Sequence, residues 1–187
     1  MNSLGGSGET GQGYDGAGTT GTNPSNTAGG GGGAGAAGTS VYGGTGKNVN
    51  ILNTTNAATA SVGQVSSGNV YYAGGGGGGY AWNVISAFTG GLGGGGTATQ
   101  GSGSNQTGPG SPATANTGGG GGGSSSGGNG PYAGGAGGSG VVILRYPAAN
   151  SITNIGAGLT QASGSPFTEG TDKVSVFIGG TGNITFS

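Results

Sequence analysis

The chain has 187 residues, of which 57 are glycine and none is cysteine or histidine. Three basic and four acidic side chains give a net charge of −1, which excludes a basic surface for nucleic acid. Without cysteine or histidine, the chain has no disulfide bonds, no thiol or imidazole catalyst and no Cys/His metal site. We therefore expect a protein that is not an enzyme and that uses no metal or cofactor.

Residues 1–38 are the first of three predicted regions and are glycine-rich with short polar interruptions. Glu9 and Asp15 form one possible carboxylate pair, but they lie among glycines, which favours roles in turns over catalysis. The region has neither the charged nor the apolar segment of a signal peptide. No stretch of the whole chain approaches the roughly 18 apolar residues of a membrane-spanning helix, so membrane insertion is not expected.

Residues 39–147 are the second predicted region, and they open with a β-competent stretch at residues 39–72. Alternation around Val49 and Ile51, and again around Val70, predicts two or three short strands. No segment of the chain shows a sustained helical period. We therefore expect essentially no α-helix.

The glycines gather in blocks, and the same second region contains most of them. Glycine blocks resemble collagen in composition, but collagen needs glycine at every third position and abundant proline, and this chain has only six prolines. The composition is also typical of a disordered linker, although disorder usually comes with a high net charge. The remaining interpretation is a bundle or sandwich of extended polyglycine II helices, whose outward N–H and C=O groups bond to neighbouring helices. The five blocks lie at residues 29–33, 74–79, 90–96, 118–123 and 134–140.

The end of the chain is rich in β-branched residues. Residues 141–146, stopped by Pro147, fit a strand that is buried on both faces. Residues 148–187 are the third predicted region, in which residues 174–178 and 183–186 predict a hairpin with Val174, Val176 and Ile178 on its apolar face. The expected fold is thus irregular and all-β, with polyglycine II helices, short strands and hairpins.

A second carboxylate pair lies in this third region. Glu169 and Asp172 flank Gly170 beside Lys173. Turn or surface ion-pair roles are expected for them rather than catalysis.

Several of these segments together resemble a known kind of domain. Residues 72–79, 90–96, 115–123 and 134–147 resemble the glycine-rich domain of bacteriophage tail fibre and other virion structural proteins, and residues 176–186 resemble the strand pair that accompanies it. The string at residues 137–147, Gly-Gly-Ser-Gly-Val-Val-Ile-Leu-Arg-Tyr-Pro, is its specific part. More loosely, the architecture is similar to tail-tip adhesins of T-even-like phages. That resemblance implies a layered sandwich of glycine helices whose end loops touch a receptor.

The leading hypothesis is a virion fibre or tail-tip protein with a rigid glycine scaffold that displays loops to a bacterial surface polysaccharide or outer-membrane protein. Tyr80, Trp82 and Phe88 are the candidate receptor-binding residues, because aromatic rings can stack on sugar or protein. In a chain with so few large apolar groups, Trp82 and Phe88 are also candidates for a small core or a subunit contact.

Two other functions stay open at this point. The first is a purely structural fibre, spacer or decoration protein that binds only its own kind. The second, more distant, is an ice-binding bundle, although the threonines lie between the glycine blocks rather than along them. If the chain is a virion protein of either kind, its expected partners are other virion proteins and copies of the same chain. A trimer is favoured, because viral fibres are usually trimeric.

Overall fold

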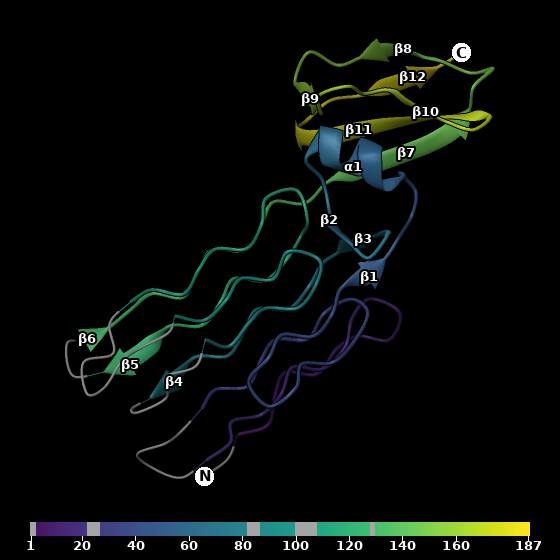
Figure 1. The fold of residues 1–187 in the computed structure, drawn as a ribbon. Helices are drawn as coiled ribbons and strands as arrows, with labels where there is room; N and C mark the ends of the chain where they lie inside the picture. Colours follow the sequence, from purple (N-terminus) through teal and green to yellow (C-terminus); the bar gives the residue numbers. More distant parts are fainter. Residues whose placement is uncertain (1–2, 22–26, 82–86, 100–107, 128–129) are drawn as a thin grey trace.

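The computed structural model describes residues 3–21, 27–81, 87–99, 108–127 and 130–187. Figure 1 shows an elongated molecule with a bundle of winding chain segments at one end and a β-rich part at the other. We call residues 3–46 and 73–139 the glycine bundle, and residues 47–72 and 140–187 the cap.

The described strands are short, and almost all of their pairings are antiparallel. One helix is present among the described residues. This confirms the prediction of an irregular all-β fold. The elements are β1 (Lys47–Asn48), α1 (Thr54–Ala60), β2 (Gln64–Ser66), β3 (Asn69–Tyr72), β4 (Tyr80–Ala81), β5 (Ser125–Gly127), β6 (Gly130–Pro131), β7 (Val142–Pro147), β8 (Ile152–Ile155), β9 (Leu159–Gln161), β10 (Phe167–Glu169), β11 (Asp172–Gly180) and β12 (Ile184–Phe186).

The glycine bundle is built from backbone hydrogen bonds between segments that are distant in the sequence. Residues 74–79 lie at its centre and are buried along their whole length. Consecutive residues of this segment bond to different neighbouring segments, and residues three positions apart bond to the same neighbouring segment. A β-strand repeats every two residues, so this repeat of three is not that of a β-strand. The N···O distances are 2.7–3.1 Å for the pairs, donor first, Gly74–Gly93, Gly77–Gly96, Gly75–Gly44, Gly78–Val41, Gly31–Gly76 and Ala28–Gly79.

Neighbouring segments of the bundle approach so closely that their backbones are themselves the packing surface. A Cβ atom added to Gly76 would lie 1.9 Å from the carbonyl oxygen of Gly121, and one added to Gly75 would lie 2.1 Å from that of Gly31. Side chains never approach a backbone this closely. Glycine is therefore required here by space, because a larger residue would force the segments apart.

The cap contains a four-stranded sheet in the order β10–β11–β7, with β9 paired to the far end of β11. Two smaller sheets, β1–β3–β2 and β12–β8, flank it. The hydrophobic core lies between this sheet and the segment that carries α1, and Leu52, Val70, Val174 and Val176 are completely buried in it. The other core residues are Ala57, Ala60, Val62, Ala162 and Phe167.

This arrangement differs from the three predicted regions. Residues 1–38 were assigned to a region of their own, and Ala28 and Gly31 of this region donate to the central segment of the bundle. Residues 47–72 were assigned to the glycine sandwich, but their apolar residues join the core beneath β11. Both differences arise because the pairing of distant segments, rather than local composition, determines the boundary between bundle and cap.

Helix α1 was not anticipated, since essentially no helix was expected. Asn53 caps its first turn by accepting a hydrogen bond of 2.8 Å from the N–H of Asn56, and Ser61 ends it in the left-handed conformation with φ of 53°. Seven residues make about two turns, which is too short for a sustained helical period to be visible in the sequence.

Two predictions about the C-terminal strands are wrong. Strand β7 is not buried on both faces, because it lies at the edge of its sheet and Val142 is 58% exposed. Residues 183–186 do not form a hairpin with β11, since β12 pairs with β8 instead. The predicted apolar face is nevertheless correct for Val174 and Val176, which are fully buried, and Ile178 packs against the same core.

Residues 39–72 contain three short strands, β1, β2 and β3, which confirms the prediction of two or three, although the alternation did not place all of them correctly. Val70 lies in β3, as expected, whereas Val49 and Ile51 lie outside the strands and β1 ends at Asn48. None of the described helices has the length and apolar character needed to cross a membrane.

Candidate functional site

One end of the glycine bundle gathers several chain segments that are far apart in the sequence. Figure 1 shows β4, β5 and β6 together at the end remote from the cap, which we call the distal end. Strand β4 pairs in parallel with β5, and β5 pairs antiparallel with β6. Nearby, Ala28 donates a hydrogen bond of 2.7 Å to the carbonyl of Gly79, which directly precedes β4.

Further contacts bring the remaining segments to the same end. Thr20 and Thr27 form an isolated antiparallel bridge and a hydrogen bond of 2.8 Å between their hydroxyls. The hydroxyl of Thr99 donates to the carbonyl of Pro109. The distal end therefore consists of the described residues that flank four intervals of the chain, residues 22–26, 82–86, 100–107 and 128–129, which lie outside the description.

The three aromatic residues predicted to bind a receptor have different positions. The backbone of Tyr80 pairs with Ser125 in the distal sheet, and Trp82 lies outside the described residues. Phe88 is only 5% exposed and packs against Ala98 and Val41. The structure thus places Phe88 in a small core within the bundle, which is the alternative that the sequence left open for it.

Tyr42 extends this small core to the surface. Its ring meets the ring of Phe88 edge to face, with centroids 6.0 Å apart and an angle of 81° between their planes. Tyr42 itself is 47% exposed. The aromatic pair fixes Phe88 below the distal end, since edge-to-face pairs are favourable beyond simple burial.

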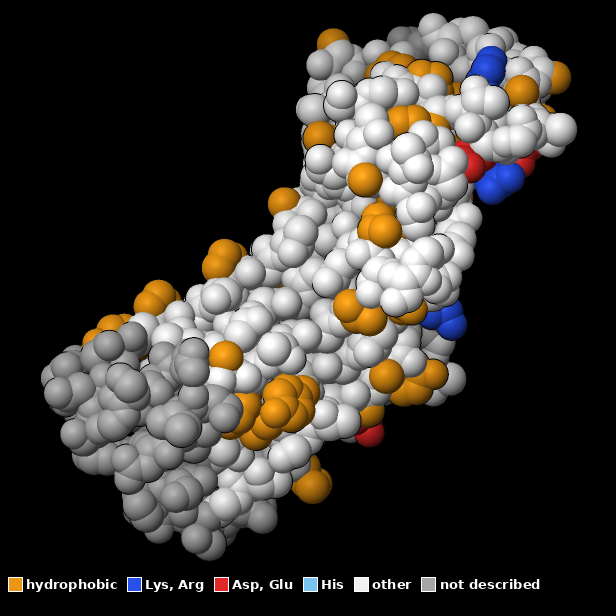
Figure 2. Space-filling model, in the orientation of Figure 1, with side chains coloured by type: hydrophobic (Ala, Val, Ile, Leu, Met, Phe, Trp, Pro, Cys, Tyr) orange, Lys and Arg blue, Asp and Glu red, His pale blue; other side chains and the backbone are white. Residues whose placement is uncertain are grey.

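The distal end is electrically neutral. No residue between 48 and 144 carries a charged side chain, and this interval includes all the distal strands. Figure 2 shows the acidic and basic side chains at the cap and along one flank of the bundle. A ligand at the distal end would consequently be recognised by hydroxyl, amide and aromatic groups rather than by charge.

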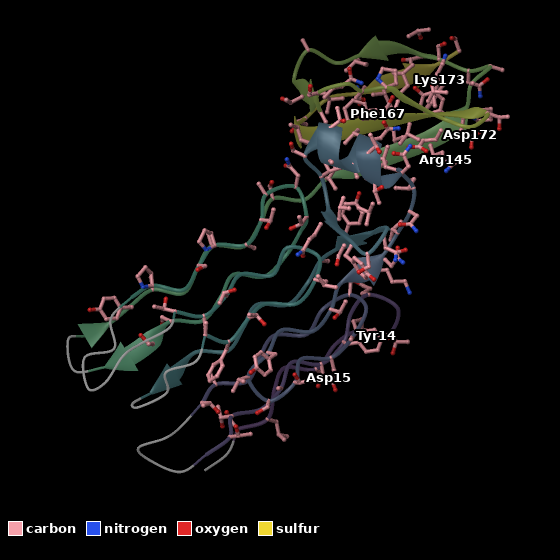
Figure 3. The ribbon with its side chains drawn as sticks, in the orientation of Figure 1. Tyr14, Asp15, Arg145, Phe167, Asp172 and Lys173 are labelled. Carbon is pink, nitrogen blue, oxygen red and sulfur yellow. The ribbon has the colours of Figure 1, made fainter. Side chains whose placement is uncertain are left out.

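The predicted carboxylate pair of the cap has a structural role. Asp172 Oδ2 accepts a hydrogen bond of 2.7 Å from Arg145 Nε, in a salt bridge between β11 and β7. The ion pair therefore forms with Arg145 rather than with the adjacent Lys173, which donates to the carbonyl of Asn150 and the hydroxyl of Ser151. Figure 3 shows Arg145, Asp172 and Lys173 close together on the cap.

Glu169, the other member of the pair, joins the C-terminal sheet to the start of α1. Its carboxylate accepts hydrogen bonds of 2.8 Å from the N–H of Asn53 and the amide of Asn56. Burial alone would raise the pKa of Glu169, but these hydrogen bonds and the nearby charge of Arg145 outweigh burial and lower it. Both carboxylates of the cap are thus engaged in holding elements together, as expected for surface ion pairs and turns.

The first carboxylate pair also fits a turn. Asp15 Oδ1 accepts a hydrogen bond of 2.7 Å from the N–H of Gly8 and so closes the loop between them. Within the described residues, no group of three or more histidine, cysteine, aspartate or glutamate side chains is placed to hold a metal ion.

Comparison with protein-family models, with curated proteins and with solved structures finds no match to this chain. The likeness to phage glycine-rich domains is therefore a prediction from the sequence. Function has to be argued from the neutral distal end and from the bundle that supports it.

Proposed function

We propose that the chain is a component of a bacteriophage fibre or tail tip, in which the glycine bundle supports a distal end that contacts a bacterial surface. The observation that carries this proposal is the convergence of β4, β5, β6 and the Thr20–Thr27 bridge at one end of the bundle. Segments gathered at one end of a rigid scaffold are well placed for recognition.

The bundle has the properties of a stiff support. Its central segment, residues 74–79, is buried and hydrogen-bonded to four neighbouring segments. Closely packed protein interiors transmit force because they are hard to compress. A support of this kind would hold the distal end away from the cap, which leaves the cap available for contacts with neighbouring virion proteins.

The neutrality of the distal end favours an uncharged ligand. With no charged side chain between residues 48 and 144, the distal end gains nothing from attraction to phosphate or carboxylate groups. Hydroxyl groups such as those of Thr20 and Thr27 suit the hydroxyl groups of a neutral surface polysaccharide. A polysaccharide is accordingly our first choice of receptor, ahead of an outer-membrane protein.

A purely structural role in the virion is the second candidate. The observation that favours it is the burial of Phe88, because a receptor-binding aromatic residue should be exposed at a free end. In that case the chain would act as a spacer between copies of itself, with a trimer as the favoured assembly. The two candidates differ in whether the distal end is free in the particle.

Cysteine labelling tests this difference directly, because the natural chain has no cysteine. We would introduce Pro109→Cys at the distal end and, in a second variant, Ala149→Cys on the cap, both at exposed positions. Particles that carry each variant would be labelled with maleimide gold and viewed by electron microscopy. Labelling of Pro109→Cys at a fibre tip, with Ala149→Cys protected, supports the receptor role.

The other outcomes are equally informative. Protection of both cysteines would indicate a spacer that is buried between neighbours. Absence of the chain from purified particles, measured by mass spectrometry, would contradict any virion role. Competition by the purified chain for attachment of the particles to cells would then complete the test of receptor binding.

A further inference from the structure

A polar hollow lies on the flank of the glycine bundle, near its junction with the cap. It has a volume of about 530 Å³, which is within the range of small-ligand sites. Figure 3 shows Tyr14 and Asp15 on this flank, next to β1. The side chains that line it are those of Thr10, Gln12, Tyr14, Asp15, Ala34, Ala37 and Lys47.

The lining of this hollow combines one aromatic ring with polar and charged groups. Tyr14 is 55% exposed and offers one aromatic ring, although the chain has few large side chains on its surface. The same hollow is lined by a hydroxyl, an amide, a carboxylate and an ammonium group, from Thr10, Gln12, Asp15 and Lys47. Among the described residues, no hydrogen bond or ion pair engages the side chains of Thr10, Gln12 or Lys47. These three groups are therefore available to a ligand.

The hollow is also held in shape before any ligand arrives. The N–H of Tyr14 donates to the carbonyl of Gly33 at 3.1 Å, which fixes the backbone that carries the ring. The carbonyl of Asp15 accepts from Gly38 at 2.9 Å, and its carboxylate closes the loop onto Gly8 at 2.7 Å. A site that is already ordered loses little conformational entropy when it binds.

We propose that this hollow is a saccharide-binding site, in which a neutral pyranose ring stacks on Tyr14 and its hydroxyls bond to Gln12, Asp15 and Lys47. A pyranose has an apolar face made of C–H groups and a rim of hydroxyls that both donate and accept. The hollow supplies the complementary parts: an aromatic face, two strong donors and a carboxylate acceptor. Ala34 and Ala37 are small, so they leave room for the ring.

Other ligand classes fit this lining less well. A phosphate or an acidic sugar would meet the ammonium of Lys47 but also the negative carboxylate of Asp15. An apolar peptide would find only one aromatic side chain and two alanines to contact. The hollow is distinct from the distal end, so this inference goes beyond the proposed function and does not depend on it.

The test begins with the purified full chain on an array of neutral hexose and N-acetylhexosamine oligosaccharides, with acidic glycans and short peptides printed beside them. The strongest neutral glycan would then be titrated against the chain while backbone amide shifts are followed by NMR. We expect the shifts to concentrate in residues 8–15, 34–37 and 47. An array without neutral hits, a preference for acidic glycans or peptides, or shifts confined to other residues would overturn the proposal.

Three substitutions sharpen this test. Tyr14→Ala removes the stacking face, so we expect affinity for the chosen glycan to fall at least about tenfold, or 1.4 kcal/mol. Tyr14→Phe keeps the ring and should bind within about threefold of the natural chain. Phe186→Ala is the matched control, since Phe186 is a 48% exposed aromatic residue on the cap, and its affinity should be unchanged.

Unchanged binding by Tyr14→Ala would contradict the stacking role. If that variant does not fold, as judged by circular dichroism and thermal unfolding, Gln12→Ala provides the second test, since Gln12 is exposed and its side chain makes no hydrogen bond among the described residues. We expect it to weaken binding severalfold, and full affinity would count against the site. The readout here is the glycan affinity of the isolated chain. A negative result would therefore count against the saccharide site without affecting the labelling test of the distal end.

Discussion

Gly76 is the residue at which the close packing of the bundle is tested most directly. The Cβ atom of an alanine would lie 1.9 Å from the carbonyl oxygen of Gly121. The neighbouring segment would have to move, because backbone cannot rotate away as a side chain can. We expect Gly76→Ala to lower the free energy of unfolding by at least about 1–3 kcal/mol, measured by urea denaturation.

Gly31 provides the matched control for this prediction. Its N–H donates to the carbonyl of Gly76, yet a Cβ atom on Gly31 would come no closer than 3.4 Å to any atom. Gly31→Ala should change stability by less than about 1 kcal/mol, and it can even stabilise the chain by restricting the unfolded state. Equal stabilities of the two variants would contradict the view that backbone contacts set the requirement for glycine.

Glu169 gives the cap a pH dependence that can be worked out in sign. The pKa of Glu169 is lower in the folded chain than its ordinary value of 4.5. Its stabilising contribution is therefore complete above that ordinary value and is lost as the pH falls through the folded pKa. We expect Glu169→Gln to cost about 1–3 kcal/mol at pH 7, because the hydrogen bonds from Asn53 and Asn56 lose their charged acceptor.

The pH series separates this role from a general loss of packing. The difference in unfolding free energy between the natural chain and Glu169→Gln should shrink as the pH is lowered from 7 to below 4.5 and then through the folded pKa of Glu169. Glu9→Gln serves as the control, since Glu9 is exposed and its side chain makes no hydrogen bond among the described residues. A cost of Glu169→Gln that stays the same throughout this acid titration would rule out the charged carboxylate as its cause.

At the scale of elements, the glycine segments should show a periodic pattern of hydrogen exchange. Along residues 28–34, the N–H groups of Ala28, Gly31 and Ala34 donate to carbonyls of the central segment at 2.7–2.9 Å. Among the described residues, no acceptor is present for the N–H groups of Gly29 and Gly30. We expect the amides of Ala28, Gly31 and Ala34 to exchange slowly by NMR and those of Gly29 and Gly30 to exchange faster, because exchange requires the hydrogen bond to open. Gly33 should also exchange slowly, since its N–H donates to the carbonyl of Ala36 at 2.9 Å.

A period of two in the exchange rates would instead indicate β-strand pairing. Uniformly fast exchange would mean that the lateral hydrogen bonds do not persist in solution. The C-terminal strand β11 provides the reference, since Val174 and Val176 are paired to β7 and buried in the core. Their amides should be among the slowest in the chain.

The elements also show which parts of the fold can be read from sequence. Apolar runs around Val70, Val142 and Val176 predicted strands correctly, because short-range β-propensity and burial agree there. The partners of those strands were not predictable, since β12 pairs with β8 rather than with the nearer β11. Pairing depends on contacts between distant segments, and the local pattern contains no information about them.

For the candidate sites too, local sequence signals were informative, whereas contacts between distant segments could not be predicted. Aromatic residues around position 80 drew attention to a segment that does lead into the distal end, through β4. A core position for Phe88 was one of the alternatives that the sequence offered, but its partners Ala98 and Val41 could not be inferred, because nothing in the sequence distinguishes them. The hollow beside Tyr14 was missed for a similar reason, since Lys47 reaches it from another part of the chain.

At the scale of the whole molecule, residues 47–72 connect the two parts and are shared by both. Strand β3 of this segment leads directly into the central glycines, 74–79. Leu52 and Val70, from the same segment, are buried beneath β11 in the core of the cap. Among its described residues the bundle has only a small core of its own, around Phe88, so its stability should depend on the cap.

This dependence predicts a single cooperative unfolding transition. Leu52 is completely buried, and Leu52→Ala should lower the free energy of unfolding by about 2–5 kcal/mol through lost burial and a cavity. Because the cap anchors the bundle, hydrogen exchange at Gly75 should accelerate together with exchange at Val176. Val65→Ala, at a 43% exposed position of β2, is the control. It should change the free energy of unfolding by less than about 0.5 kcal/mol and leave the exchange rates at Gly75 and Val176 unchanged. Faster exchange at Val176 alone would show that the bundle holds its structure independently of the cap.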